Sequence, residues 1–344
     1  MLWVIGDVHG MYDALEGILS GIRSREMLGE RTDKVVFIGD LIDRGPASKE
    51  VMDRVAALEY DKVILTGNHE DMAMRFIDHD VDFLWNYGNQ WFGNGGVKTY
   101  ESILGAERPD LMKKLSNCHD DPFYEDKDPS FECLRIRKTL QGETSEVREP
   151  GFSCCDYSVM RLPAKYEDFI RCGTYSYKEN GVWFFHGVPR SDQSLEVQAV
   201  KTRAEFDEYR RSNGRVPIDF SFLWGRDYDA EKGYDGLLVH GHTPVRRPDG
   251  LPFLFSRGRG AGYRQTSPEN RPVFDCGEGG KLEAINVDTA AVFGGALSAV
   301  GLSAECLARG EIPLLTVFTP KSEAASENRG SAVYRVIQIE RPWG

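Results

Sequence analysis

Short apolar runs alternate with amphipathic stretches along the first part of the chain. Leu2–Ile5, Val35–Ile38 and Val63–Leu65 are continuous apolar runs with the length of buried strands. The stretches that follow them carry apolar residues at helical spacing, and Pro46 suits the first turn of the second one. Strands that alternate with helices indicate βαβ units and a parallel sheet. The helices are predicted over 15–22, over 46–58 and over Glu70–Ile77.

The alternation stops between Leu104 and Arg171, where scattered charges and prolines replace it. We expect an insertion at about 106–175 that is partly helical and lies near the rim of the site as a lid. A second irregular segment, rich in Gly, Arg and Pro, predicts a long loop at about 246–280. Further strands are predicted at Val182–Phe185, Gly236–Val239, Leu282–Val287, Leu314–Phe318 and Val333–Ile339.

Composition and charge narrow the class of protein. The chain has 344 residues, 41% of them hydrophobic and 28% charged, as in soluble globular proteins. A formal charge of −12 without a long basic run argues against a nucleic-acid partner. Because no apolar run approaches the roughly 20 residues that span a bilayer, and no signal-peptide pattern opens the chain, we expect a cytoplasmic protein without a membrane partner.

The seven cysteines show no repeated pair at zinc-finger spacing. Free thiols in a reducing compartment are therefore expected. The adjacent Cys154 and Cys155 leave a redox role open.

Polar residues with metal-ligand character follow five of the apolar runs. In α/β sheets, ligands gather at the carboxyl ends of the strands, so these side chains are expected to meet at one rim. Carboxylate, amide and imidazole groups together suit a metal cluster. Each residue alone has an ordinary reading, such as a helix cap for an Asp, and for His240 that reading is kept. The residues are Asp7, His9, Asp40, Asn68, His69, His186, His240 and His242.

Several segments around these residues resemble a known family. Gly6-Asp7-Val8-His9-Gly10, Gly39-Asp40-Leu41-Ile42-Asp43-Arg44-Gly45 and Gly67-Asn68-His69-Glu70 resemble, in order and spacing, the three signature motifs of phosphoprotein phosphatases. These are the serine/threonine phosphatases among the calcineurin-like metallophosphoesterases. Phe185-His186-Gly187-Val188 and Gly241-His242-Thr243 resemble the segments with the family's remaining metal histidines.

Two further segments resemble the bacterial branch, which includes symmetrical diadenosine tetraphosphatases. They are Trp91–Gly96 and Asn286–Gly295. The family more often has Gly where Ala290 stands, and both irregular segments are longer than usual. For Trp91–Gly96, a Gly-rich turn packed by an aromatic ring and a substrate contact are equally open readings.

The resemblance implies an α/β metallophosphoesterase fold, in which two packed mixed β-sheets are flanked by helices in αββα layers. Ligands come from both halves of the chain, so we expect residues 1–344 to form a single domain. The resemblance also implies two divalent metal ions, expected to be manganese, with iron or zinc as alternatives. One ion would be held by Asp7, His9 and Asp40, and the other by Asp40, Asn68, His186 and His242.

The same resemblance implies the catalytic roles. A hydroxide that bridges the two ions would attack phosphorus in line. His69 would protonate the departing oxygen as the general acid, with Asp43 holding its ring. Arg44, Asn68 and Arg226 would contact the substrate phosphate.

The expected activity is hydrolysis of phosphate monoesters by a serine/threonine protein phosphatase, with a phosphoprotein or phosphopeptide as substrate. The pair Asp43-Arg44 favours this class, because the diadenosine tetraphosphatase branch more often departs from Asp at the first position. Hydrolysis of a nucleotide polyphosphate such as diadenosine tetraphosphate is the alternative. A metal-binding scaffold without turnover is a third hypothesis, and the presence of both His69 and Asp43 argues against it.

Overall fold

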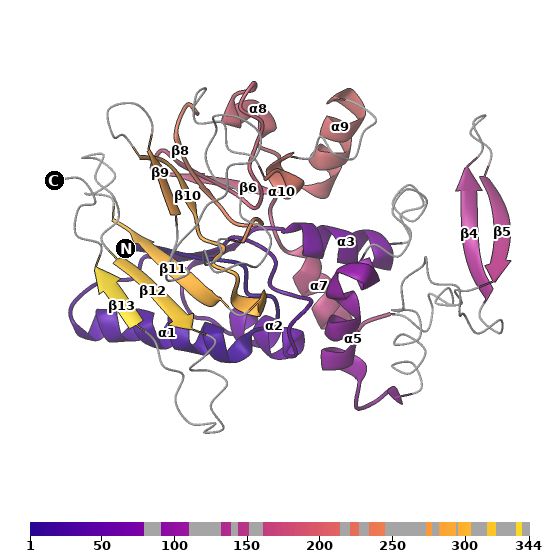
Figure 1. The fold of residues 1–344 in the computed structure, drawn as a ribbon, viewed down its shortest axis with the longest axis horizontal. Helices are drawn as coiled ribbons and strands as arrows, with labels where there is room; N and C mark the ends of the chain where they lie inside the picture. The colour runs from indigo at the N-terminus through magenta and orange to yellow at the C-terminus, as the bar shows by residue number, and fades with distance from the viewer. Residues whose placement is uncertain are drawn as a thin grey trace.

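The computed structural model describes most of the chain in two layers of sheet with helices outside (Figure 1). The described residues are 1–78, 91–109, 132–138, 144–150, 161–213, 221–226, 234–244, 273–276, 282–293, 295–303, 315–320 and 335–338.

The first sheet has six strands in the order β13-β12-β11-β1-β2-β3. Strands β1, β2 and β3 run parallel, as the alternation of strands and helices predicts. Strands β11, β12 and β13 add antiparallel to the other edge of β1. The sheet is therefore mixed, with the following strands: β1 Leu2–Ile5, β2 Lys34–Phe37, β3 Lys62–Ile64, β11 Ala296–Leu302, β12 Leu315–Pro320 and β13 Arg335–Gln338.

The second sheet has five strands in the order β6-β7-β8-β10-β9. Strands β7, β8 and β10 run parallel, and β6 and β9 pair antiparallel at the two edges. A separate pair, β4 and β5, is antiparallel. The bounds are β4 Glu132–Lys138, β5 Thr144–Pro150, β6 Ser176–Glu179, β7 Val182–Phe185, β8 Leu237–His240, β9 Val273–Cys276 and β10 Leu282–Asn286.

Helices cover the outer faces of both sheets. Helix α1 packs on β11 and β12 and contacts α2, while α3, α5 and α7 form a group beside them (Figure 1). A π-helical turn at Phe92–Gly96 leads directly into α5. The helices are α1 Tyr12–Met27, α2 Ser48–Ala56, α3 Asn68–Ile77, α5 Val97–Leu104, α7 Ala164–Arg171, α8 Leu195–Gln198, α9 Arg203–Asn213 and α10 Ser221–Trp224.

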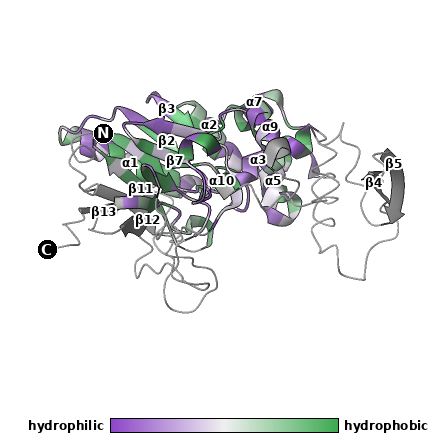
Figure 2. Cartoon of the chain, turned by 90° about the horizontal axis from the view of Figure 1, so that it is seen from above, coloured by the Kyte–Doolittle hydropathy of each residue, from purple (hydrophilic) through white to green (hydrophobic). Residues whose placement is uncertain are grey.

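Alternation of side chains along the strands builds the layers. In β7, Val182 and Phe184 belong to an apolar cluster that joins the two sheets, whereas Trp183 and Phe185 belong to a cluster with α3, α5 and α9. Successive strand residues point to opposite faces, so one short strand serves two cores. Figure 2 shows hydrophobic residues concentrated around β2, β7 and α1. The cluster between the sheets consists of Val4, Val36, Ile38, Leu65, Val182, Phe184, Val239, Ile285, Val287, Val300 and Leu302.

The predicted strands and helices are present with small shifts of their ends. Helix α2 begins at Ser48, two residues after Pro46, and α1 extends beyond the predicted 15–22. The predicted loop at about 246–280 is wrong where β9 forms, because Val273–Cys276 pairs antiparallel with β10. Most of that segment and much of the predicted insertion at about 106–175, with Cys154 and Cys155, lie outside the described residues.

Among the helices that the structure describes, none combines the length and the apolar character required to cross a membrane.

Candidate active site

The predicted ligand residues meet at the carboxyl ends of five strands. Asp7 and His9 follow β1, and Asp40 follows β2. His186 follows β7, and His242 follows β8. The rim that the sequence predicts is therefore present, and both sheets contribute to it. Asn68 and His69 complete the group from the first turn of α3, which starts four residues after β3 ends.

Asp40 lies at the centre of the site. Its Oδ2 atom is 3.4 Å from His9 Nε2 and 3.3 Å from His186 Nε2. The same oxygen is 3.9 Å from His69 Nε2, and Oδ1 accepts the backbone N–H of His69 at 3.1 Å. One carboxylate therefore touches imidazoles from three different segments, which suits an oxygen shared by two cations.

Asn68 joins the remaining imidazoles. Its Oδ1 atom is 2.9 Å from His186 Nε2 and 2.8 Å from His242 Nδ1. Asp7 Oδ2 accepts the backbone N–H of His242 at 3.0 Å, so β1 and β8 are tied together beside this group. We name the set of Asp7, His9, Asp40, Asn68, His186 and His242 the carboxylate–imidazole cluster.

Glu70 fixes the loop that carries Asp40. Its Oε2 accepts from the backbone N–H groups of Asp40 at 2.8 Å and Gly67 at 2.9 Å, and Oε1 accepts from Leu41 at 2.8 Å. Burial and the nearby Asp40 charge raise the pKa of Glu70 to about 7. Glu70 therefore acts on the backbone of the β2 loop, and the sequence motif around it has a positioning function.

Asp43 and His69 form a buried pair beside the cluster. His69 Nδ1 lies 2.7 Å from Asp43 Oδ2, and both side chains have 0% exposure. The opposite ring atom, His69 Nε2, is buried without a hydrogen-bond partner among the described residues. We name the pair the Asp43–His69 dyad; its free nitrogen is available to a group bound in the site.

The backbone around the site is held in left-handed conformations. The φ angles are +46° at His9, +52° at Asp40, +73° at Asp43, +66° at Arg44 and +65° at His242. Non-glycine residues rarely adopt this region, and such strain is found where the surroundings fix a functional geometry. All five of these residues belong to the predicted site.

Glycines allow the carboxylates to approach the backbone. A Cβ atom at Gly67 would collide with Asp40 Oδ1, and one at Gly241 would collide with Asp7 Oδ1. These two glycines are therefore required by close approach, and a side chain at either position would displace a carboxylate.

The buried charges of the cluster are not balanced by the chain. Burial, together with the charges of Asp288 and Asp40, raises the pKa of Asp7 well above its usual range. For His186, burial opposes the charged form, but Asp40 overrides it and raises the pKa to about 9. Without a cation, His186 thus retains a proton, because the neighbouring Asp40 carboxylate attracts positive charge.

The cluster fits divalent cations. Asp7 Oδ1 and His242 Nε2 are buried without partners in the part of the chain that the structure describes. Two groups of atoms are compact enough to hold an ion, His9–Asp40–His69 and Asp40–His186–His242. Asp40 belongs to both groups. The first contains His69 instead of the predicted Asp7, so geometry alone leaves His69 within reach of a cation as well as of a substrate.

The predicted arginines lie beside the cluster in different settings. Arg44 Nη1 donates to His9 Nε2 at 2.7 Å, and its guanidinium lies 5.2 Å from the ring centroid of Phe293. Arg226 is exposed, just after α10, and its charge contributes to the lowered pKa of His242, for which burial is the largest cause. His240 is buried with its Nδ1 atom 3.1 Å from Gly241 O, and it belongs to neither compact group.

Sequence reasoning missed three polar residues of the site. Asp288 is buried, its pKa is raised by burial to about 6, and its charge acts on Asp7. Trp91 and Thr99 both donate hydrogen bonds to Asp43. Two of the three lie in segments noted only for their resemblance to bacterial members, and Thr99 carried no signal, because its role depends on packing.

The structure also explains the departure at Ala290. Its φ angle is +65°, in the region that favours glycine. The turn that follows Asp288 therefore adopts the same conformation that a glycine would take without strain, and Ala290 N donates to Asp288 Oδ1 at 3.0 Å.

Comparisons with known proteins agree with this geometry. Residues 1–141 match the family described as Calcineurin-like phosphoesterase. Serine/threonine-protein phosphatase 2 of Escherichia coli (strain K12) is 34% identical over 121 residues, which are 35% of this chain and 50% of that protein. A symmetrical bis(5'-nucleosyl)-tetraphosphatase of Xylella fastidiosa (strain 9a5c) is 38% identical over 69 residues, 20% of this chain and 22% of that protein.

The chain spans about half the length, or less, of these curated relatives. Among solved structures, the cold-active protein-tyrosine phosphatase of a psychrophile, Shewanella sp., has a TM-score of 0.44 at 13% identity, covering 98% of this chain and 80% of its own. The family match over residues 1–141, the order of the motifs and the layered mixed sheets agree, and this part of the chain is similar to calcineurin-like phosphoesterases.

Proposed function

We propose that this site hydrolyses phosphate monoesters with the help of two divalent cations, and that phosphoserine or phosphothreonine in proteins is its substrate class. The observation that carries the proposal is the position of the Asp43–His69 dyad. A buried imidazole with a free Nε2 atom lies 3.9 Å from Asp40 Oδ2, beside the cluster that fits cations.

The carboxylate–imidazole cluster would hold the cations. Asp7, His9 and Asp40 would bind one, and the second would share Asp40 with Asn68, His186 and His242. We propose that both ions are manganese. Iron and zinc are alternatives, because mixed oxygen and imidazole ligands accept all three metals. When bound, the cations supply positive charge to the phosphate oxygens and an activated water as the nucleophile.

Arg44 would interact with two groups in this proposal, His9 and the substrate phosphate. Its Nη1 atom donates to His9 Nε2, and that nitrogen has a single lone pair to give. The same lone pair cannot serve Arg44 and a cation together. The guanidinium must therefore release His9 when a cation binds there, and its Nη1 atom then joins the other N–H donors that can contact a substrate phosphate. Arg226 and Asn68 are proposed as further phosphate contacts.

The dyad supplies a proton to the leaving group. Burial raises the pKa of Asp43 to about 8 and lowers that of His69 to about 3, so at neutral pH the pair holds one proton between the carboxyl and Nδ1. The other ring proton then resides on Nε2, whichever partner formally holds the shared one. Transfer of the Nε2 proton to the departing oxygen leaves His69 with a proton on Nδ1 and Asp43 as a carboxylate.

Two relatives support different substrates. The similar proteins include serine/threonine-protein phosphatases and symmetrical bis(5'-nucleosyl)-tetraphosphatases. A dinucleoside polyphosphate therefore remains the second candidate. The presence of Asp43 in the dyad favours the monoester, as the sequence resemblance implies.

A direct comparison of substrates tests the proposal. Chelator-stripped enzyme, with manganese added back, is assayed with a phosphoserine peptide and with diadenosine tetraphosphate. Manganese-dependent release of phosphate from the peptide, at a higher kcat/KM than for the dinucleotide, is expected. A strong preference for the dinucleotide would move the function to nucleotide hydrolysis, and turnover of neither would leave a cation-binding scaffold.

A further inference from the structure

Both oxygens of Asp43 are fully engaged. Oδ2 accepts from Trp91 Nε1 at 2.7 Å and also faces His69 Nδ1 at 2.7 Å. Oδ1 accepts from Thr99 Oγ1 at 2.6 Å. The four side chains are at most 1% exposed, so water does not compete for these hydrogen bonds. Neutral donors from a different part of the chain thus surround the carboxylate that orients His69.

Thr99 fixes the side-chain torsion of Asp43 as well as its charge. Its Oγ1 atom accepts from the backbone N–H of Asp43 at 3.0 Å while donating to Oδ1 of the same residue. Ser48 Oγ lies 3.2 Å from the same hydroxyl and accepts from Asp43 N at 3.1 Å. A residue held at φ +73° is thereby clamped at both its backbone and its carboxylate.

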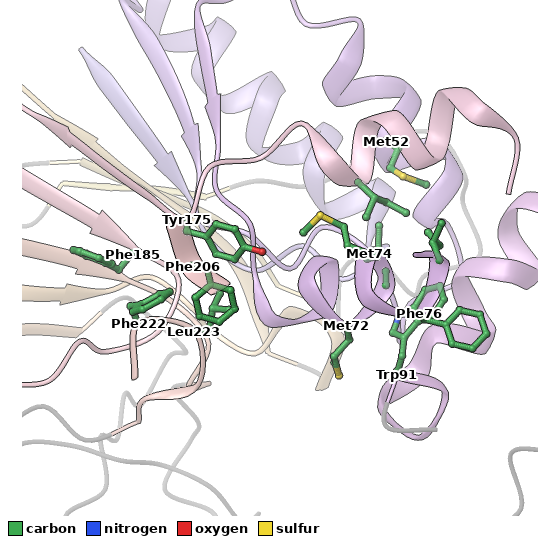
Figure 3. Close-up of a cluster of buried hydrophobic side chains, with 14 of the residues drawn as sticks. Met52, Met72, Met74, Phe76, Trp91, Tyr175, Phe185, Phe206, Phe222 and Leu223 are labelled. Carbon is green, nitrogen blue, oxygen red and sulfur yellow. The ribbon is translucent and has the colours of Figure 1, made fainter. Parts of the chain in front are cut away.

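Trp91 is itself packed against aromatic side chains. Its ring lies 5.4 Å from that of Phe76 and 5.5 Å from that of Tyr100, centroid to centroid, and Figure 3 shows it next to Phe76 at one end of the apolar cluster. The π-helical turn Phe92–Gly96 follows it, and a Cβ atom at Gly96 would press on the indole at 2.7 Å. The indole is thus closely packed in an orientation in which its N–H donates to Asp43 Oδ2.

We propose that Trp91 and Thr99 are positioning residues for proton donation by His69. They hold Asp43 in the one orientation that pairs with Nδ1 and directs Nε2 at the leaving group, and they stabilise the carboxylate that remains after the proton has left. This inference rests on the proposed function, in which His69 is the acid. It assigns a function to the Trp91–Gly96 segment without any substrate contact.

A purely structural role for Trp91 and a positioning role depend on different parts of its side chain. A purely structural Trp91 needs only a ring of suitable size against Phe76 and Tyr100, and phenylalanine would satisfy it. A positioning Trp91 needs the Nε1–H donor. The two roles therefore separate in the variant Trp91→Phe, which keeps a ring and removes the donor.

Four variants test the proposal in the manganese-loaded enzyme. Trp91→Phe and Thr99→Val each remove one donor to Asp43, and Thr99→Ser keeps the hydroxyl. Trp183→Phe is the matched control, because Trp183 is 4% exposed, belongs to the same apolar cluster and stacks on Phe185. Each variant is assayed with p-nitrophenyl phosphate, whose leaving group needs little protonation, and with a phosphoserine peptide, whose leaving group needs it fully.

Loss of a hydrogen-bond donor to Asp43 should slow the reaction whose leaving group requires protonation. For Trp91→Phe and Thr99→Val we expect kcat for the phosphoserine peptide to fall roughly ten- to hundredfold, a part of what general acid catalysis supplies. KM and bound manganese are unchanged, and p-nitrophenyl phosphate hydrolysis falls less than about threefold. Thr99→Ser and Trp183→Phe retain nearly full activity on both substrates. Equal losses on both substrates, or a matching loss in Trp183→Phe, would reduce the two residues to packing.

A second readout does not depend on turnover. In the zinc-loaded protein, the His69 Nδ1 proton in its hydrogen bond to Asp43 is expected to give a downfield proton NMR signal that His69→Asn removes. Trp91→Phe and Thr99→Val shift or broaden this signal, whereas Trp183→Phe does not. An unmoved signal in the two donor variants overturns the inference. If the wild type hydrolyses neither ester, the proposed function fails, and the signal still decides whether Trp91 and Thr99 position the dyad.

Discussion

Two buried polar groups lie side by side in this site, and they are built in opposite ways. The carboxylate–imidazole cluster leaves Asp7 Oδ1 and His242 Nε2 without partners in the described structure, and its carboxylates are too many for the positive charge that the chain provides. The dyad has every oxygen of Asp43 engaged by a donor. Unpartnered buried atoms are costly unless a ligand satisfies them, so the cluster is shaped for added cations, whereas the dyad is already assembled.

Asp40 is the point at which the cluster is most easily broken. In Asp40→Asn we expect loss of both cations and a fall in phosphopeptide turnover on the order of a thousandfold or more, because the shared charge is removed. Metal content after dialysis and kcat/KM measure the two effects. Asp53→Asn, on the outer face of α2, is the control and keeps both. Two ions retained in Asp40→Asn would contradict the shared-ligand assignment.

His69→Asn separates the dyad from the cluster. We expect turnover of the phosphoserine peptide to fall about a hundredfold to a thousandfold, with the metal content unchanged. The metal content of this variant is informative, because His69 lies close enough to His9 and Asp40 to share a cation with them. Loss of one ion in this variant would make His69 a ligand and would remove the distinction between the two groups.

The cation-free chain should lose stability between pH 7 and pH 9. Despite burial, Asp40 raises the pKa of His186 to about 9 from its usual 6.5, so this proton's contribution is complete below the usual value and is lost as the pH rises through about 9. Burial raises the pKa of Asp43 to about 8, and its loss of a proton acts in the same direction.

Denaturant unfolding at each pH measures this effect. A decrease of about 2 kcal/mol in the free energy of unfolding is expected without metal, since one pKa unit corresponds to about 1.4 kcal/mol. Saturating manganese should flatten the profile, because a cation takes the place of the His186 proton. A profile that manganese leaves unchanged would mean that the cluster does not bind it.

Ala290→Gly is the mildest test. Relief of the left-handed strain at φ +65° should raise the free energy of unfolding by up to about 1 kcal/mol, the difference between alanine and glycine in this region. The turn next to Asp288 is otherwise preserved, so metal content and turnover should not change. A loss of stability would show that the alanine methyl group is needed for packing.

The cluster could be predicted from the sequence because its residues follow apolar runs directly. Asp7, Asp40 and His186 are each one to three residues beyond a strand end, and topology then brings them together. The order of the motifs also predicts that Asn68 and the Asp43–His69 dyad lie beside these residues. The assignment of His69 to the substrate or to a cation depends on distances of a few ångströms, which no sequence pattern contains.

The other features depend on tertiary packing. β11 has the sequence Ala-Leu-Ser-Ala-Val-Gly-Leu, rich in small residues, and it forms a strand because it is buried between β1 and β12. β6 is largely polar and forms an edge strand on β7. Trp91 and Thr99 reach Asp43 across 48 and 56 residues of sequence, so their function could only be seen in the folded chain.

The most direct test of the account is a manganese titration of chelator-stripped protein, in which bound metal and phosphopeptide turnover are followed together. The account predicts that turnover rises with bound manganese and reaches its plateau at about two equivalents, as two cations sharing one carboxylate require. Full turnover without added metal after complete stripping, or two ions bound with no turnover of any phosphoester, would contradict it.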